Sequence, residues 1–316
     1  MKIAVTGGSG FIGTRLIEQL RGEGHEIVII DIVHDTPINI LDQEKMNAAM
    51  AGCEAIYHLA AAHRDDVFPR SEYYEVNGKG TANVIKAADA NNIKRIIFTS
   101  TVALYGLNVG TPTEENPVKP FNDYGKSKLE AEQHLKKWST DNADVAVTIV
   151  RPVVVFGENN RGNVHTLINQ ISSGKFLMIG SGKNKKSMAY VGNVAGFLKH
   201  CLTEKSGCSV YNYADKPDFT TRELTDEIYT QLGIKKSALS VPYPIGLGAG
   251  YAFDILAKVS GKTLPISSIR VQKFCADTTV AAPKMEQSDF TPQYTLADGV
   301  ARMIKHDFAD RIQKAA

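Results

Sequence analysis

The sequence of 316 residues predicts an α/β fold with a doubly wound parallel sheet and a smaller C-terminal lobe. Short runs rich in Val and Ile alternate with helical patterns through the first half of the chain. These runs are apolar throughout, as parallel strands covered by helices on both faces must be. A glycine-rich turn also follows the first run directly. Together these observations are typical of a parallel sheet with crossover helices.

The elements of the first half follow from this alternation. We expect buried strands at residues 2–5, 26–31, 55–59, 95–100 and 145–151, and helices at 11–21, 43–50, 74–91 and 125–141. The second half is less regular, with a helix at 163–174, a strand at 176–179 and a helix at 221–232 that Thr220 or Thr221 caps. We therefore expect a first domain at residues 1–160, joined by strands returning from about 176–215, and a substrate lobe formed mainly by 161–316.

The charge balance excludes some classes of partner. The chain has 36 basic and 34 acidic residues, a formal charge of +2, and no block of like charges. A nucleic-acid binder usually shows a concentrated basic patch, so we expect no nucleic-acid partner. The calculated pI of 8.2 is compatible with a pocket for an anion.

The four cysteines and the N-terminus indicate the compartment. Cys53, Cys201, Cys208 and Cys275 form neither a metal motif nor a disulfide framework, so we expect free thiols and no metal. The chain starts with a strand pattern rather than a signal peptide. We therefore expect a cytoplasmic protein.

One late apolar stretch, residues 245–256, raises the question of membrane contact. Glycines and Asp254 interrupt it, and it is too short to span a bilayer. We interpret it as a packing helix and expect no membrane partner, with membrane contact as the alternative.

The glycine-rich turn predicts a dinucleotide site. It reads Thr-Gly-Gly-Ser-Gly-Phe-Ile-Gly and lies between the first strand and the first helix. Glycines let the backbone approach a pyrophosphate, and the helix N-terminus offers N–H groups and a favourable dipole. This context makes the domain Rossmann-like. The expected cofactor contacts here are Gly7, Gly10, Phe11, Ile12 and Gly13.

Asp31 predicts the form of the dinucleotide. It ends the second expected strand, where a carboxylate accepts hydrogen bonds from the adenosine ribose and repels a 2′-phosphate. No arginine follows it closely. The predicted cofactor is therefore NAD rather than NADP, although a strand-end aspartate also serves as a simple turn residue.

Tyr124 and Lys128 form a Tyr-x-x-x-Lys pair near a helix start, on one helix face. A nearby ammonium lowers the pKa of a tyrosine toward that of a general base. Ser100 and Thr101 follow a strand at the sheet edge where ligands bind, although such hydroxyls often only cap helices.

In these motifs the chain resembles the extended short-chain dehydrogenases/reductases of the NAD-dependent epimerase/dehydratase family. The resemblance covers most of the chain. Besides the motifs above, it includes His-Leu-Ala-Ala at 58–61, Val-Asn-Gly-Lys-Gly-Thr at 76–81, Leu-Tyr-Gly at 104–106, Arg-Pro at 151–152 and Phe-Gly at 156–157.

The resemblance implies roles for individual residues. Tyr124 is then the acid/base, Lys128 its partner, and Thr101 the catalytic hydroxyl with Ser100 beside it. Leu59, Ala60 and Ala61 then line the cofactor site, and Asn77 supports the cofactor side of it. Contacts to the diphosphate of a nucleotide sugar fall on Asn163, Lys186 and Arg270. A homodimer is also expected.

Some positions depart from the family pattern. Asn39 replaces a common aspartate near the adenine, and Val154 stands where many UDP-galactose-type 4-epimerases have an asparagine. The gating position falls at Thr278, or at Phe274 in another alignment. A small gate admits an N-acetyl group.

Three functions remain open from the sequence. The leading hypothesis is NAD-dependent epimerisation at C4 of a UDP-hexose or UDP-N-acetylhexosamine through a 4-keto intermediate. The alternative is a 4-ketoreductase that takes NADH or NADPH and acts on a UDP-4-keto-6-deoxy-N-acetylhexosamine, which Val154 favours. The third is a non-catalytic dinucleotide-binding regulator, which the retained Tyr124 and Lys128 disfavour.

Overall fold

The computed structural model describes residues 1–64, 67–106, 109–236, 239–260 and 267–312. The chain divides into two compact units, each built from separate stretches of sequence. The first consists of Met1–Val155, Ala189–Ala214 and Val280–Gln293, and the second of Phe156–Met188, Asp215–Thr279 and Tyr294–Ala316.

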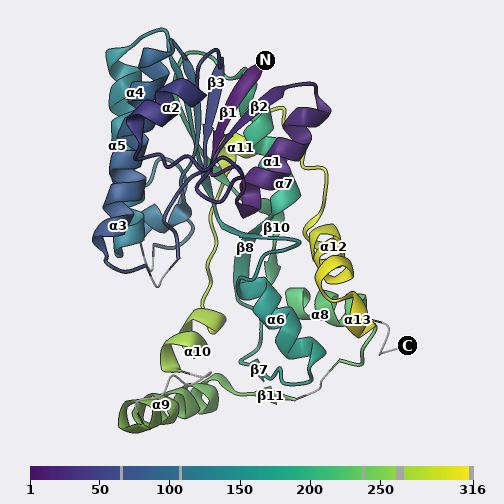
Figure 1. Ribbon diagram of the computed structural model, residues 1–316. Helices are drawn as coiled ribbons and strands as arrows, with labels where there is room; N and C mark the ends of the chain where they lie inside the picture. Colours follow the sequence, from purple (N-terminus) through teal and green to yellow (C-terminus); the bar gives the residue numbers. More distant parts are fainter. Residues whose placement is uncertain (65–66, 107–108, 237–238, 261–266, 313–316) are drawn as a thin grey trace. The chain divides into compact units, whose positions relative to one another are not determined.

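A six-stranded parallel sheet forms the centre of the first unit and confirms the predicted fold class (Figure 1). Its strand order is β2-β1-β3-β4-β5-β9. The strands are β1 (Lys2–Thr6), β2 (Glu26–Ile30), β3 (Ala55–His58), β4 (Arg95–Thr99), β5 (Ala146–Pro152) and β9 (Gly207–Tyr213). Because β2 and β3 lie on opposite sides of β1, the strand order reverses beside β1, where open sheets of this kind bind their ligands.

Helices cover both faces of this sheet (Figure 1). Side chains alternate between the faces along each strand: Ile3 and Val5 pack in one apolar cluster and Ala4 in the other. The first cluster includes residues of α1 (Phe11–Gly22) and α7 (Val191–His200). The second includes residues of α2 (Gln43–Ala49), α4 (Gly80–Ala90) and α5 (Asp123–Asp141).

The single helix expected at 74–91 is divided into two segments, and a short helix precedes it. The structure has α3 (Ser71–Tyr73), the π-helical η1 (Tyr74–Lys79) and then α4. Such wide turns often occur at functional sites, because they turn a side chain away from the regular helical face. The buried residues of η1 are Asn77 and Gly78, and of these Asn77 carries a side chain.

The second unit combines small sheets with helices. Strands are ordered β10-β8-β6 and β11-β7. Their bounds are β6 (Val154–Phe156), β7 (Met178–Ile179), β8 (Lys185–Tyr190), β10 (Asp215–Thr220) and β11 (Ser240–Val241). The helices include α6 (Asn163–Ser172), α8 (Thr221–Leu232), α12 (Leu296–Asp307) and α13 (Ala309–Ile312). The cap of α8 is Thr220, in a reciprocal capping box with Glu223.

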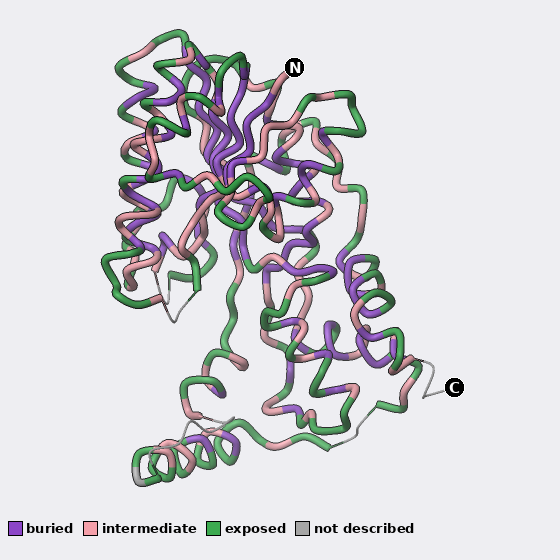
Figure 2. Tube along the Cα trace, viewed as in Figure 1, coloured by how far each residue is buried: buried purple, intermediate pink, exposed green. Residues whose placement is uncertain are grey.

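The apolar stretch at 245–256 lies in α9 (Tyr243–Ser260), beside α10 (Ser268–Cys275). Its interpretation as a packing helix is wrong for most of its bulky side chains: Figure 2 shows α9 exposed along much of its length. The inward positions are instead largely taken by small residues, which bring the helix axis close to its neighbours. Across the described parts of the chain, no helix is both long and apolar enough to cross a membrane.

Candidate active site

The glycine loop leaves room for a dinucleotide backbone. Gly7 has a φ of +69°, and a Cβ on it would lie 2.6 Å from the backbone nitrogen of Ala60. Only glycine satisfies both conditions. Gly10 is the N-cap of α1, and no side chain caps this helix. The first-turn N–H groups, including those of Phe11 and Ile12, can therefore face a pyrophosphate, which fits NAD.

Asp31 follows β2 immediately and borders the same loop. Its Oδ2 accepts a hydrogen bond from the Ser9 N–H at 3.0 Å, and its Oδ1 accepts one from the Val33 N–H at 3.1 Å. These bonds hold the carboxylate at the loop and leave lone pairs for ribose hydroxyls. The residues present therefore fit the adenosine end of NAD.

We expect the Asp31→Ala variant to bind NAD about ten-fold more weakly, since one charge-assisted contact is lost. The difference in affinity between NAD and NADP should become smaller, because the repulsion of a 2′-phosphate also disappears. Titration of the wild type, of Asp31→Ala and of a control variant with each cofactor measures these affinities. Asp35→Ala, which removes an exposed charge nearby, is the matched control. Tighter binding of NADP than NAD by the wild type would contradict the assignment.

Asn77 is buried and forms hydrogen bonds with the segment that follows β3. Its Oδ1 accepts from the Ala62 N–H at 2.9 Å, and its Nδ2 donates to the Ala62 carbonyl at 3.0 Å. Nδ2 also donates to Ser127 Oγ on α5 at 2.9 Å. Asn77 thus ties Ala62, which follows the half-buried run Leu59, Ala60 and Ala61, to Ser127 of α5.

Tyr124 lies in the first turn of α5 and meets Thr101 at the end of β4. Its hydroxyl is hydrogen-bonded to the Thr101 side chain. Thr101 also caps the short 3₁₀ helix η2 (Val102–Tyr105), where its Oγ1 accepts from the Ala103 N–H at 3.1 Å. Its side chain therefore has a capping contact and a contact with Tyr124 at once.

The expected lowering of the Tyr124 pKa by Lys128 is wrong in this structure. The pKa of Tyr124 is raised to about 12, because burial of the hydroxyl outweighs the hydrogen bond with Thr101. Deprotonation of Tyr124 therefore requires additional positive charge at the site.

Lys128 lies one turn along α5 and is 2 % exposed. Its Nζ lies 4.0 Å from the centroid of the Phe98 ring, a cation–π contact. Burial lowers the pKa of Lys128 to about 7, against the attraction of Glu132. In the described residues no hydrogen bond to this Nζ is found. Its N–H donors therefore suit a ribose hydroxyl or a tyrosinate, and the predicted shared helix face is present.

Glu132, which the sequence reasoning missed, lies one turn further on and is fully buried. It accepts hydrogen bonds from Ser100 Oγ at 2.7 Å and from Arg151 Nε at 2.8 Å. The second Arg151 bond, from Nη2, is 2.7 Å long. This bidentate pair keeps the pKa of the Glu132 carboxyl below its usual value despite burial. Its spacing four residues after Lys128 is the signal that could have identified it.

This network separates the two predicted hydroxyls. The Ser100 hydroxyl donates its hydrogen bond to Glu132, whereas Thr101 meets the Tyr124 hydroxyl. Arg151 continues the network to the Tyr105 hydroxyl at 2.9 Å, which donates to Asn212 Oδ1 at 2.7 Å. The Ser100 hydroxyl is thereby used within the buried network, whereas the Thr101 side chain lies at the Tyr124 hydroxyl.

His58 lies buried below this site between two threonines. Its Nδ1 is 2.7 Å from Thr6 Oγ1, and its Nε2 is 2.9 Å from Thr81 Oγ1. Burial lowers the pKa of His58 to about 3, with repulsion from Lys128 in the same direction. The ring is therefore neutral at physiological pH and ties β1, β3 and α4 together.

His58 should make folding sensitive to acid. The unfolded histidine has a pKa near 6.5, so below that pH the unfolded state binds a proton that the folded state does not. The contribution of neutral His58 to the free energy of unfolding is complete above pH ~6.5 and is lost toward pH ~3, by up to about 1.4 kcal/mol per pH unit. The His58→Gln variant should show a shallower dependence in urea unfolding at several pH values. The exposed His63→Gln should retain the wild-type slope, and an unchanged slope in His58→Gln would contradict the assignment.

The predicted substrate residues belong to the second unit. Asn163 is exposed at the start of α6. Lys186 Nζ donates to the carbonyls of Lys273 at 2.9 Å and Ala276 at 2.8 Å, at the end of α10, the helix that carries the exposed Arg270. Lys186 is therefore partly used as a helix cap, with one N–H donor left.

The two gating candidates also lie near Lys186. Thr278 is exposed and forms an isolated parallel bridge with Lys186, while the Phe274 ring lies edge-on to Phe176 at 6.2 Å. Thr278 is thus the better placed to admit a bulky group. Val154, in the first unit, is 50 % exposed at the start of β6.

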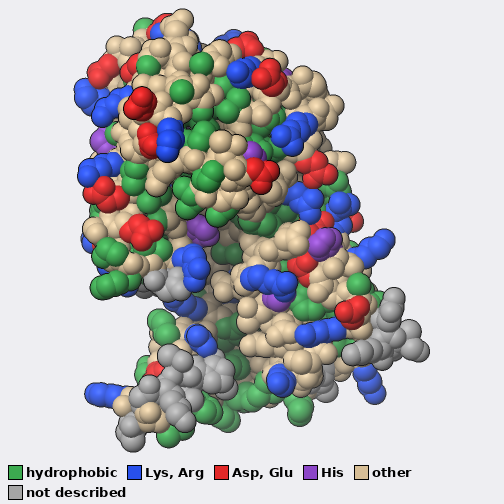
Figure 3. Space-filling model, viewed as in Figure 1, with side chains coloured by type: hydrophobic (Ala, Val, Ile, Leu, Met, Phe, Trp, Pro, Cys, Tyr) green, Lys and Arg blue, Asp and Glu red, His purple; other side chains and the backbone are tan. Residues whose placement is uncertain are grey.

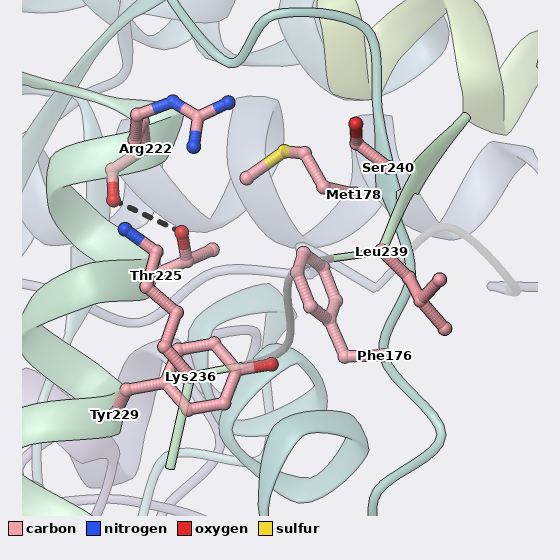
Figure 4. A pocket seen from close by; sticks show the side chains of 8 residues that line it. All are labelled: Phe176, Met178, Arg222, Thr225, Tyr229, Lys236, Leu239 and Ser240. Atoms are coloured by element: carbon pink, nitrogen blue, oxygen red, sulfur yellow. Dashed lines mark hydrogen bonds between the residues drawn. The ribbon is translucent and has the colours of Figure 1, made fainter. Parts of the chain in front are cut away.

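A cavity of about 310 Å³ lies in the second unit (Figure 4). Phe176, Met178 and Tyr229 give it an apolar wall. Of its two cations, Arg222 donates to the Ser181 carbonyl and Lys236 pairs with Asp226. Because both cations have partners, this cavity is better suited to a flat or apolar group than to a diphosphate.

The remaining chemistry-bearing side chains are dispersed. Among residues 1–64, 67–106, 109–236, 239–260 and 267–312, no cluster of three His, Cys, Asp or Glu could hold a metal ion, and the four cysteines are free. Acidic and basic side chains are interspersed over the face shown in Figure 3.

The family model for the NAD dependent epimerase/dehydratase family matches residues 3–214. The chain belongs to this family. The predicted NAD cofactor and the predicted type of enzyme are therefore confirmed, and the resemblance seen in the motifs is correct.

Two curated relatives are 4-epimerases, in agreement with the predicted reaction. One is the N-acetyl-alpha-D-glucosaminyl-diphospho-ditrans,octacis-undecaprenol 4-epimerase of Escherichia coli O157:H7, 45% identical over 97% of this chain and 95% of its own. Another is the UDP-glucose 4-epimerase of Vibrio cholerae, 31% identical over 83% of each chain. The UDP-N-acetylglucosamine 4-epimerase structure from Bacillus cereus has the same fold, with a TM-score of 0.76, 21% identity, and coverage of 96% of this chain and 95% of that one.

Proposed function

We propose that this protein epimerises C4 of an N-acetylhexosamine joined through a diphosphate to a polyprenol. The observation that carries the proposal is the 45% identity, over 97% of the chain, to an enzyme named for a substrate of that kind. A nucleoside diphosphate sugar offers the same diphosphate and sugar, so the carrier is the part that distinguishes the two substrates.

The site residues support proton transfer at O4. Tyr124 removes the O4 proton, and Thr101, which already meets the Tyr124 hydroxyl, holds the same oxygen by a hydrogen bond. Lys128, one turn further along α5, offers N–H donors to the ribose of the cofactor or to the tyrosinate. NAD, held by the glycine loop and Asp31, would supply reversible hydride transfer at C4.

Binding of the substrate requires groups for the diphosphate. We assign these to Asn163, Lys186 and Arg270, of which the last two are cationic and associated with α10. The exposed Thr278 leaves room for an N-acetyl group. The free cysteines support a reducing compartment, and we propose the cytoplasm and a homodimer, which molar-mass measurement in solution tests.

The test is incubation of purified protein with polyprenyl-diphospho-N-acetylglucosamine and, separately, with UDP-N-acetylglucosamine, without added NADH. We expect the C4 epimer from the lipid-linked sugar and no net change in nicotinamide absorbance. Epimerisation of the UDP-sugar alone would contradict the polyprenol carrier. Oxidation of NADH by a UDP-4-keto-6-deoxy sugar, with no epimer in either mixture, would instead assign the ketoreductase reaction.

A further inference from the structure

Helix α9 has two glycines inside and most of its bulky apolar residues outside. A Cβ on Gly246 would lie 2.5 Å from Ile179 Cγ2 of β7, and one on Gly250 would lie 2.8 Å from Ser268 Cα of α10. Glycines therefore form the contact of α9 with both neighbours. A helix that packs into a protein core normally has the opposite arrangement.

The outer side of α9 is apolar and continuous. Its exposed fractions are 64 % for Ile245, 52 % for Tyr251, 67 % for Ile255 and 52 % for Leu256. At 100° per residue these four fall on one side of the helix, together with the exposed Gly248, Ala249 and Ala252. Helix α10 adds Ile269, 54 % exposed. A contiguous exposed patch of this kind marks an interaction surface.

The charges around this patch are nearly all positive. Among the described residues 239–260 and 267–276 the only acid is Asp254, against three bases: Lys258, Arg270 and Lys273. The Asp254 carboxylate lies on the inner side and accepts a hydrogen bond from the Ser268 N–H at 3.1 Å. An apolar face with cationic flanks suits the interface of an anionic bilayer. Two copies of this patch would bring like charges together, which disfavours self-association through it.

We infer that the outer face of α9, with Ile269 of α10, docks on the surface of an anionic phospholipid bilayer. The inference rests on the proposed function, because a polyprenyl-linked sugar remains anchored in the membrane while its diphosphate and sugar enter the enzyme. It revises the expectation of no membrane partner and takes up the alternative that the sequence left open for residues 245–256.

Flotation with vesicles tests the docking. Full-length protein should bind vesicles of phosphatidylglycerol and phosphatidylethanolamine, bind phosphatidylcholine vesicles more weakly, and release as salt rises. Ile255→Glu should weaken partitioning about ten-fold, since a charge enters the apolar face. Leu41→Glu adds the same charge at an exposed apolar residue of the first unit and should bind as the wild type does. Absence of wild-type binding, or equal binding by both variants, would overturn the inference, as would a loss of oligomers in Ile255→Glu, which would assign the face to a second copy.

A second assay separates this inference from the proposed function. A water-soluble short-chain isoprenyl-diphospho-N-acetylglucosamine should be epimerised equally by wild type and Ile255→Glu. The long-chain substrate in vesicles should be converted about ten-fold more slowly by Ile255→Glu alone. If the wild type converts neither substrate, the proposed function fails. If it converts both without binding vesicles, only the docking fails.

Discussion

The Tyr124→Phe variant should lose epimerisation by about 100- to 10,000-fold, the range for a general acid–base group. The phenol oxygen meets Thr101 at the end of β4, whereas the nearby Ser127 hydroxyl on α5 is already bonded to Asn77 and to the Tyr124 carbonyl. The ring is kept in this variant, so its packing near Tyr73, at 6.3 Å between centroids, should persist. Initial rates with the lipid-linked sugar measure the loss.

Two controls belong to this variant. NAD binding and the thermal unfolding midpoint should stay near the wild-type values, because only a hydroxyl oxygen is removed. Tyr74→Phe, one of the neighbouring tyrosines, whose hydroxyl donates to Asp123, should leave the rate within a few fold. Near-wild-type turnover by Tyr124→Phe would remove Tyr124 from its role.

Of all the substitutions proposed, one that breaks the Glu132–Arg151 ion pair should lower the free energy of unfolding most. Both side chains are buried, at 0 % and 2 % exposure, and their two hydrogen bonds lie at 2.7 and 2.8 Å. Removing one partner leaves an uncompensated buried charge, which costs about 3–5 kcal/mol. Glu132→Leu should therefore lower the free energy of unfolding by about that amount in urea titration.

The double variant Glu132→Leu/Arg151→Met distinguishes charge from packing. Since neither charge remains buried, its stability should exceed that of Glu132→Leu. Equal stability of the single and double variants would show that the uncompensated charge is not the cause. Lys136→Met removes the partly exposed third partner of Glu132 and should cost no more than about 1 kcal/mol.

The sequence by itself determined the sheet, the cofactor loop and the family. Strands that are buried on both faces must be largely apolar, and the close approach of the Ala60 backbone to Gly7 excludes any side chain at this position. Asp31, Tyr124 and Lys128 could be proposed as site residues because each holds a fixed place relative to a strand end or a helix start. These are local constraints, and short stretches of sequence encode them.

Tertiary structure alone decided which hydroxyl is free and how the ionisable groups behave. The family resemblance assigns Thr101 and places Ser100 beside it, and only the fold shows that the Ser100 hydroxyl donates its hydrogen bond to Glu132. The pKa values of Tyr124 and Lys128 depend on burial, which packing of distant strands and helices produces. The same holds for α9: its composition suggested a core helix, but close contacts at Gly246 and Gly250 turn its bulky side chains outward. These hydrogen bonds, pKa values and exposures depend on residues far apart in the sequence, so no short stretch of sequence predicts them.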